Sequence, residues 1–360
     1  MPEQAVGRRS RTGRAARAAG ALAVVPLALA GGVLPASPVR AETAPGAGVD
    51  AYGPPVTRCS ITDPRLPELS GLATAGQTLL AMNDGGDATT VYVLDAACAV
   101  GEVRSAVVDP YDPEDLALAP DGTIWLADTG DNRQDRATVA MIGMRPDGST
   151  SLTRLTYPDG AHDAEALLLA PDGTPYLVTK EVLGSSAVYR PDAPLVDGAT
   201  LTMSKVATVG FTLTGTPGGP VGRAGQLLVT GGAVSGDGQR IALRTYTDAY
   251  VWPLEGSDVV AALRGAPVRV PLPASPQGEA ISFAANGRDL VVSGEGLPAV
   301  VTLVPVDGPV APAAATGPAD SAPAATPPVS ARAGAITAAA IAAAVATLAV
   351  WIWGKLRRRS

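Results

Sequence analysis

Short apolar stretches separated by turn signals run through the middle of the chain. One phrase recurs: a Glu, an apolar stretch, a Pro-Asp-Gly or Asn-Gly type turn, a second apolar stretch, and a polar or charged cluster. The phrase begins at Glu68, Glu114, Glu165 and Glu279, and at Gly231 without the Glu. Self-similarity at this spacing indicates structural repeats, and repeats of short strands predict a β-propeller.

The connections between the apolar stretches have hairpin chemistry. Residues 120–123 and 171–174 both read Pro-Asp-Gly-Thr, in which Gly supplies a positive φ. The sequence indicates no long amphipathic helix between Thr57 and Val306. It therefore predicts an all-β body over residues 56–306.

The repeat spacing limits the number of blades. Glu114 follows Glu68 by 46 residues and Glu165 follows Glu114 by 51 residues, which suits four strands and their loops. The interval from Glu165 to Gly231 is 66 residues, so it carries either an insertion near residues 212–224 or a degenerate blade. The prediction is a β-propeller of five or six four-stranded blades.

The last repeat is short of its fourth strand. Residues 56–61, which precede the first repeat, are expected to supply that strand and close the ring. Closure removes an exposed sheet edge that would otherwise recruit other chains. We therefore expect a monomeric body.

The N-terminal residues have the pattern of an export signal. Residues 1–41 combine an Arg-rich start, an apolar stretch and small residues at the places that a signal peptidase reads. Twin-arginine export is the weaker alternative, because no apolar pair closely follows Arg8 and Arg9. Residues 42–55 are then an N-terminal extension of the mature chain.

The C-terminal residues predict a membrane anchor. Residues 333–354 contain no charge over 22 residues, which is about 33 Å of helix and enough to cross a bilayer. The basic tail 355–360 is expected in the cytoplasm, so the body would lie outside the cell on a single-pass protein of the cell membrane. Residues 307–332 are rich in Pro and Ala and predict an extended stalk. A soluble Ala-rich helix is the alternative to the membrane span.

Charge excludes one class of partner. Residues 42–332 hold 17 Lys and Arg against 33 Asp and Glu, a net charge of −16 that the basic ends reduce to −7 for the whole chain. An acidic body does not suit nucleic acid, whose phosphates need Lys and Arg. It is compatible with cation binding, or simply with solubility.

The two cysteines predict a cross-link. Cys59 and Cys98 form an even pair in a chain with an export signal, which favours a disulfide over two free thiols. Metal ligation is disfavoured, because the single histidine, His162, has no cysteine near it in the sequence.

A propeller brings the polar positions of the repeats together. The first strand of each blade lines the central channel, so the Glu that opens it and the polar cluster after the second strand should meet at one mouth. The expected ring consists of Glu68, Asn83, Asp84, Glu114, Asp128, Asp131, Asn132, Glu165, Lys180, Glu181, Arg244, Glu279 and Glu295.

So many carboxylates repel one another unless a cation or neighbouring Lys and Arg offset them. Carboxylate and amide oxygens suit Ca²⁺, so calcium is the expected cofactor if the ring binds a metal. The alternative is that these residues cap strands and accept backbone N–H bonds between blades.

Several motifs carry a family resemblance. Glu-Leu-Ser-Gly-Leu at 68–72, Asp-Thr-Gly-Asp-Asn-Arg at 128–133 and Arg-Thr-Tyr at 244–246 resemble exported bacterial β-propellers of the WD40/YVTN-like type. The group is distantly similar to phytase-like and gluconolactonase-type propellers. The resemblance implies a channel Ca²⁺ held from different blades, for which the matching residues are Glu68, Asn83, Asp128 or Asn132, and Glu279. Glu114 joins this metal set as a member of the predicted ring.

Two functions remain open from the sequence. The first is an extracellular, membrane-anchored propeller that binds a ligand or protein partner at its acidic mouth without catalysis. The second is a Ca²⁺-dependent hydrolase of lactone, ester or phosphoester bonds, with a mouth carboxylate or His162 as the base. A serine hydrolase is disfavoured because no Gly-x-Ser-x-Gly motif occurs.

Overall fold

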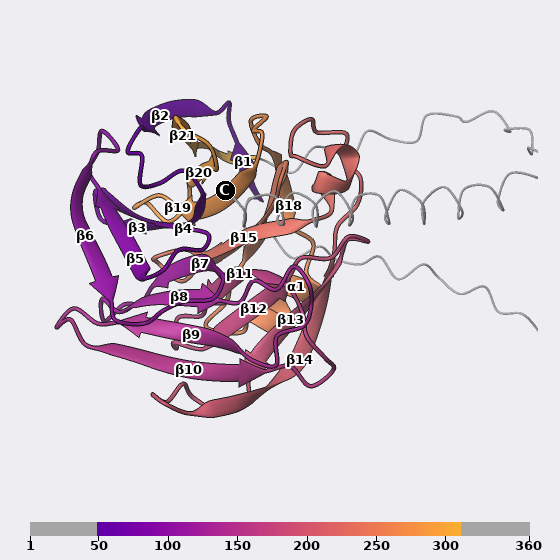
Figure 1. Cartoon of the computed structure of the whole chain (residues 1–360). Helices are drawn as coiled ribbons and strands as arrows, with labels where there is room; N and C mark the ends of the chain where they lie inside the picture. The colour runs from indigo at the N-terminus through magenta and orange to yellow at the C-terminus, as the bar shows by residue number, and fades with distance from the viewer. Residues whose placement is uncertain (1–48, 311–360) are drawn as a thin grey trace, which may run out of the picture. The chain divides into compact units, whose positions relative to one another are not determined.

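The computed structural model describes residues 49–310, and the predicted signal peptide, most of the stalk and the membrane helix lie outside them. Within 49–310, no helix is long and apolar enough to cross a membrane. The described residues form five antiparallel four-stranded units, arranged as in Figure 1. Two of these units join into one eight-stranded sheet, because residues 154–156 pair in parallel with residues 200–202.

The sheets follow one another along the chain as blades. Blade one contains β3 (Leu69–Ala75), β4 (Thr78–Asn83), β5 (Thr89–Leu94) and β6 (Val100–Ala106). Blade two contains β7 (Pro113–Leu118), β8 (Ile124–Asp128), β9 (Val139–Met144) and β10 (Thr150–Thr156). Blade three contains β11 (Ala164–Leu169), β12 (Pro175–Thr179), β13 (Ser185–Pro191) and β14 (Thr200–Gly210).

The remaining blades include one strand from the N-terminal side. Blade four contains β15 (Val229–Val234), β16 (Arg240–Thr245), β17 (Asp248–Pro253) and β18 (Val268–Pro271). Blade five contains β19 (Gly278–Phe283), β20 (Leu290–Gly294), β21 (Ala299–Val304) and β2 (Val56–Ile61). Beside the blades, β1 (Val49–Tyr52) pairs with β22 (Val306–Val310), and helix α1 (Val259–Arg264) precedes β18.

The first strands close into a ring. In the order β3, β7, β11, β15 and β19, each first strand packs against the next, and β19 packs against β3. These strands gather around a common centre, while the last strands lie further out (Figure 1). The all-β expectation is confirmed, and this arrangement is that of a β-propeller.

The long interval after Glu165 is an insertion. Between β14 and β15 the described chain forms a short 3₁₀ helix, η1 (Gly222–Gln226), and no strand. Asp248 fixes this segment, because its buried carboxylate accepts hydrogen bonds from the hydroxyls of Thr214 and Thr216 at 2.8 Å. The described residues therefore contain five blades.

Residues 56–61 close the ring as predicted. β2 pairs antiparallel with β21, from Val56 opposite Leu303 to Ile61 opposite Ala299. The outermost strand of blade five thus comes from the opposite end of the described chain. Such closure holds both ends of the described body in one sheet.

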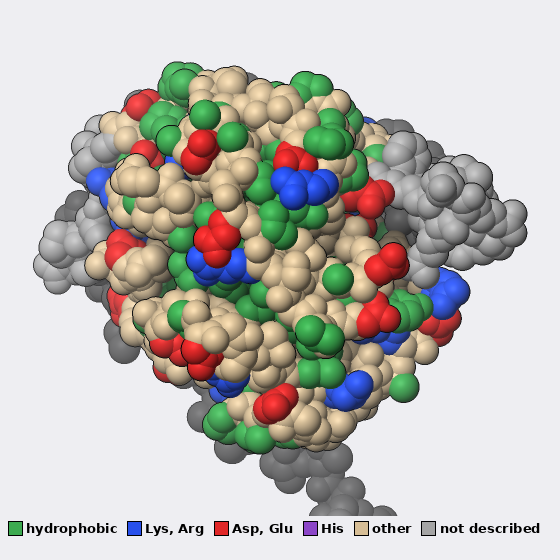
Figure 2. Space-filling model, turned by 60° about the vertical axis from the view of Figure 1, so that its left-hand side comes forward, with side chains coloured by type: hydrophobic (Ala, Val, Ile, Leu, Met, Phe, Trp, Pro, Cys, Tyr) green, Lys and Arg blue, Asp and Glu red, His purple; other side chains and the backbone are tan. Residues whose placement is uncertain are grey.

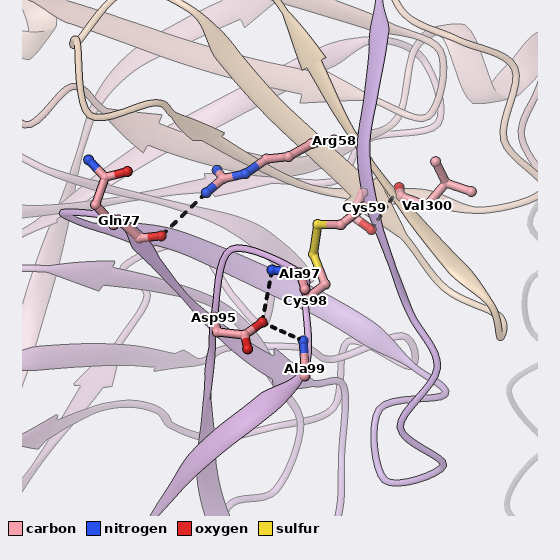
Figure 3. The surroundings of a disulfide bond; sticks show 9 residues. Arg58, Cys59, Gln77, Asp95, Ala97, Cys98, Ala99 and Val300 are labelled. Carbon is pink, nitrogen blue, oxygen red and sulfur yellow. Dashed lines mark hydrogen bonds between the residues drawn. A yellow bond between two sulfur atoms is a disulfide. The ribbon is translucent and has the colours of Figure 1, made fainter.

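A disulfide reinforces this closure (Figure 3). Cys59 lies in β2 of blade five, and Cys98 lies in the turn between β5 and β6 of blade one. The Asp95 carboxylate accepts the backbone N–H groups of Ala97 and Ala99, both at 2.9 Å, which orders the turn around Cys98. The predicted disulfide is present and joins the first blade to the last.

Replacing both cysteines (Cys59→Ala with Cys98→Ala) should lower the free energy of unfolding by about 4 kcal/mol, since the bond closes a long loop in the unfolded chain. The cysteines are 39 residues apart. Denaturant unfolding of the oxidised chain and the double variant measures this loss. Reductant should destabilise the parent and leave the variant unchanged; equal stability of the two oxidised proteins would contradict the role.

Polar side chains also tie neighbouring first strands together. Asp115, in β7, is fully buried, and its carboxylate accepts backbone N–H groups of Leu116 at 2.8 Å, Leu167 at 2.8 Å and Gly232 at 3.0 Å. These donors belong to β7, β11 and β15, the first strands of three blades. One carboxylate thus accepts a backbone N–H group from the first strands of three blades. Asp115 was not among the residues predicted from the sequence.

Asp115→Ala should cost at least about 3 kcal/mol of stability, because three buried N–H groups lose their acceptor at roughly 1–3 kcal/mol each. Denaturant unfolding provides the measurement. Asp87→Ala, at an exposed loop position, is the matched control and should change little. A loss below about 1 kcal/mol for Asp115→Ala would show that the channel rearranges to satisfy these groups.

Candidate functional site

A β-bulge recurs where each first strand begins. In the first four blades the register with the second strand shifts around one residue: Ser70, Glu114, Glu165 and Thr230. In blade five the shift spans Glu279 and its neighbour. A bulge redirects a side chain at the end of a strand, so it sets what faces the channel mouth.

The position of the bulge in blade one shows that Glu68 does not align with Glu114, although the sequence had suggested that it does. Ser70, not Glu68, occupies the position of Glu114, and Thr230 rather than Gly231 occupies it in blade four. The hydroxyls of Ser70 and Thr230 donate to the carbonyl oxygens of Glu114 and Gly278 in the next blade. Carboxylates therefore occupy three of the five bulges.

Two further positions complete the mouth. The residue that follows the second strand donates its backbone N–H to the carbonyl oxygen of the residue two positions before the bulge. Asp84 donates to Glu68 in this way, and Lys180 donates to Asp163. The residues before the bulges include Asp112 and Asp163, and those after the second strands include Asp84, Lys180, Tyr246 and Glu295.

The carboxylates converge into one cluster. Ligand oxygens of Asp84, Asp112 and Glu114 all lie within 4.8 Å of one another. Glu114 also forms a second such group, with Asp163 and Glu165. We call these five carboxylates, with Glu279, Glu295 and Lys180, the mouth cluster.

The mouth cluster is buried rather than spread over the surface. Glu114, Glu165 and Glu279 are 4%, 3% and 3% exposed. On the face shown in Figure 2, by contrast, Asp and Glu side chains are dispersed among polar and apolar ones. Burial of so many carboxylates needs positive charge or protons to offset their repulsion.

Lys180 supplies part of that charge. Its Nζ lies 2.5 Å from Glu165 Oε1 and 5.1 Å from the centre of the Tyr246 ring. Burial alone would lower the pKa of Lys180, but the neighbouring Glu165 and Tyr246 raise it well above its usual value. The shift favours the charged form of Lys180.

The pKa values of several carboxylates in the mouth cluster are raised. Burial raises the pKa of Glu114, and Asp84 and Glu165 raise it further. Burial also raises the pKa of Asp163 to about 6, against the opposing effect of Lys180. The pKa of Glu279 is raised by burial to about 7. A divalent cation would release these protons by supplying the charge instead.

The backbone approaches the carboxylate cluster closely at Gly130. Gly130 faces the carboxylates of Asp112 and Glu114, and a Cβ there would lie 2.8 Å from the carboxyl carbon of Asp112. A set of carboxylate oxygens at these separations fits Ca²⁺, a hard cation with oxygen ligands.

Other predicted metal ligands are engaged elsewhere. Asp128 Oδ1 accepts the backbone N–H of Asp112 at 2.8 Å and pairs with Arg136 at 3.1 Å. The Asn83 side chain bonds backbone groups of Glu68 and Arg65, and Asn132 is exposed. Asp128 and Asn83 thus position the loops that carry the cluster. Glu68 is half-buried beside Asp84.

Three predicted mouth residues have structural contacts. Arg244 donates to the carbonyl oxygens of Ala280 and Ser293, each at 2.7 Å, which ties blade four to blade five. Asp131 accepts backbone N–H groups within its own loop, from Asp135 and Arg136. Glu181 lies 3.9 Å from His162.

His162 lies in an aromatic cluster. Its Nε2 is 3.1 Å from Asp159 Oδ1 and 2.9 Å from the Tyr189 hydroxyl, and its ring packs against Tyr157 at a centroid distance of 5.0 Å. Within the described residues, these contacts engage the ring that the sequence proposed as a general base. The adjacent Asp163, which was not among the site residues predicted from the sequence, belongs to one of the two carboxylate groups of the mouth cluster.

Comparisons with known proteins give structural similarity to β-propellers and no sequence family. No family model matches the chain, and no curated protein matches its sequence. A gluconolactonase from Xanthomonas campestris is 18% identical, with 72% of this chain and 100% of that chain covered and a TM-score of 0.39. The WD40 repeats of RRP9 are 14% identical over 66% and 67%, with a TM-score of 0.34.

Virginiamycin B lyase from Staphylococcus aureus is 9% identical over 72% of this chain and 76% of its own, with a TM-score of 0.36. These proteins include enzymes and a repeat domain, so the shared architecture names no function. The functional argument therefore rests on the mouth cluster of this chain.

The metal-free chain should lose stability as pH rises from about 4.5 to 7. Asp163 and Glu279 have folded pKa values of about 6 and 7, above their usual 3.8 and 4.5. The folded state therefore binds more protons in this window, and stability falls with rising pH until both groups ionise. Denaturation midpoints in chelator at several pH values measure the slope.

Glu279→Gln should flatten this slope, since its amide cannot ionise. Glu255→Gln changes the same atoms at an exposed position and should keep the parent slope. Parallel pH profiles for Glu279→Gln and the parent would contradict the raised pKa.

Proposed function

We propose that this protein is a binding propeller whose mouth cluster holds one Ca²⁺ and presents it to an extracellular ligand or protein partner, without catalysis. The observation that carries the proposal is the convergence of Asp84, Asp112 and Glu114 within 4.8 Å. Lys180 is ion-paired with Glu165, in the neighbouring group, so charge remains to be offset here.

The loops around the mouth support a binding role. Five large apolar side chains are exposed in the connections on the side where the first strands begin: Val107, Tyr111, Leu183, Leu213 and Leu297. Val107 is fully exposed and Leu183 is 74% exposed. Exposed apolar side chains gathered around the channel mouth favour contact with a macromolecule over contact with solvent.

We also propose that the protein is anchored in the cell membrane with its propeller outside the cell. The signal-like residues 1–41 and the uncharged span 333–354 would export the body and anchor it to the cell membrane, with the basic tail in the cytoplasm. The stalk 307–332 would hold the mouth away from the lipid surface.

Calorimetry of the full-length chain after chelation tests the cation site. We expect one Ca²⁺ with micromolar affinity and at least tenfold weaker binding to Glu114→Gln, because Glu114 belongs to both carboxylate groups. Glu255→Gln should bind as the parent does. No binding at millimolar calcium would overturn the proposal.

A Ca²⁺-dependent hydrolase is the second candidate function, and substitution of Glu114 also tests it. Its candidate bases are a mouth carboxylate and His162, which is hydrogen-bonded to Asp159 and Tyr189. Calcium-loaded chain should not turn over lactone, aryl-ester or phosphoester probes above the blank. Turnover that Glu114→Gln abolishes and His162→Ala retains would replace the binding role with this hydrolase.

A further inference from the structure

Lys180 breaks the charge pattern of the mouth. It is the first residue after the second strand of blade three, a position held by Asp84 in blade one and Glu295 in blade five. Its side chain is 9% exposed. A lysine is seldom buried without acidic partners, so its surroundings show what it does there.

The ammonium group of Lys180 lies among oxygen ligands. It pairs with Glu165 at 2.5 Å, and Glu165 forms a metal-type group with Glu114 and Asp163. The Tyr246 ring lies 5.1 Å away. A singly charged group thus sits where several oxygens would otherwise face one another.

Glu279 gives independent evidence for a ligand position near Lys180. It is 3% exposed, and its Oε2 is fully buried with no hydrogen-bond partner among the described residues. Lys180 and Glu279 affect each other electrostatically, as do Glu165 and Glu279. A buried carboxylate oxygen without a partner is costly and marks a place for a ligand.

We propose that the Lys180 ammonium takes the place of a second divalent cation, so that the mouth cluster is a two-cation site in which the protein fills one position itself. The proposal rests on the proposed calcium site at Asp84, Asp112 and Glu114. Lys180 then fixes the metal stoichiometry at one and leaves Glu165 and Asp163, with the shared Glu114, as the latent second site.

Replacing Lys180 should open this latent site. Lys180→Met keeps the approximate length of the side chain and removes the positive charge that pairs with Glu165, while Arg244 still acts on Glu279. Calorimetry of the full-length chain with Ca²⁺ should give two cations per chain for Lys180→Met and one for the parent. Lys205→Met, the same change at an exposed position of β14, should keep one.

Adding Glu165→Gln to Lys180→Met should return the count to one, because it removes the principal ligand of the second site. One cation per Lys180→Met chain, with Lys205→Met unchanged, would overturn the inference and leave the proposed calcium site standing. No cation on the parent and one on Lys180→Met would overturn the calcium site but retain Lys180 as a cation substitute.

Luminescence locates the second ion. Terbium(III), which binds oxygen ligands as Ca²⁺ does, is sensitised by a nearby tyrosine, and Tyr246 lies beside the Lys180 ammonium. Lys180→Met should gain tyrosine-excited terbium emission over the parent, and adding Tyr246→Phe should remove the gain. A gain that survives Tyr246→Phe would place the ion elsewhere and contradict the inference.

A folding defect would also be decisive. If Lys180→Met is unfolded in chelator, Ca²⁺ should fold it, because the ion replaces the missing charge. Thermal melts should then show a steeper dependence of Tm on calcium concentration than in the parent, since two ions are released on unfolding. A variant that stays unfolded at 10 mM calcium, about ten-thousandfold above a Kd of about 1 µM, would refute the proposed role of Lys180 as a cation substitute.

Discussion

Electrostatic repulsion at the channel mouth is the constraint on which the rest of the site depends. The ring of first strands forces the bulge positions of five blades towards one axis, and three of these positions carry Glu. Two Asp residues before the bulges and two acids after the second strands add to the charge. The fold therefore concentrates negative charge where little water can screen it, and protons, Lys180 or a bound cation must offset it.

The scaffold is built to hold such a cluster. β2 completes the sheet of blade five, and the disulfide between Cys59 and Cys98 joins that blade to blade one. Inside the ring, Asp115 bonds the edges of three first strands. The closing strand, the disulfide and the Asp115 hydrogen bonds hold the blades together against the repulsion between the mouth carboxylates. The cluster can thus stay assembled while its protonation changes, which a cation site with exchangeable protons requires.

The sequence was a good guide to the periodic features and a poorer one to the mouth. Recurrent turns and apolar stretches predicted the strands, because strands and hairpins depend on local pattern. The missing strand of the last repeat predicted the ring closure, and the even pair of cysteines predicted the disulfide. Glu68 was misaligned with Glu114, since the hairpin of blade one is shorter and Ser70 takes its bulge. Asp112 and Asp163 precede their strands, outside the repeated phrase, yet both lie in the carboxylate groups of the mouth cluster. Asp128 was a sound choice by chemistry, but Arg136 follows eight residues later and pairs with it.

The central claim is that the carboxylates of Asp84, Asp112 and Glu114 enclose a cation. Crystallography of the chain grown with terbium(III) in place of calcium tests it most directly, because anomalous scattering locates the ion without reference to the protein model. The account predicts one strong anomalous peak among these three carboxylates, with Lys180 still paired to Glu165. A peak only at exposed surface carboxylates, with none at the mouth, would contradict it.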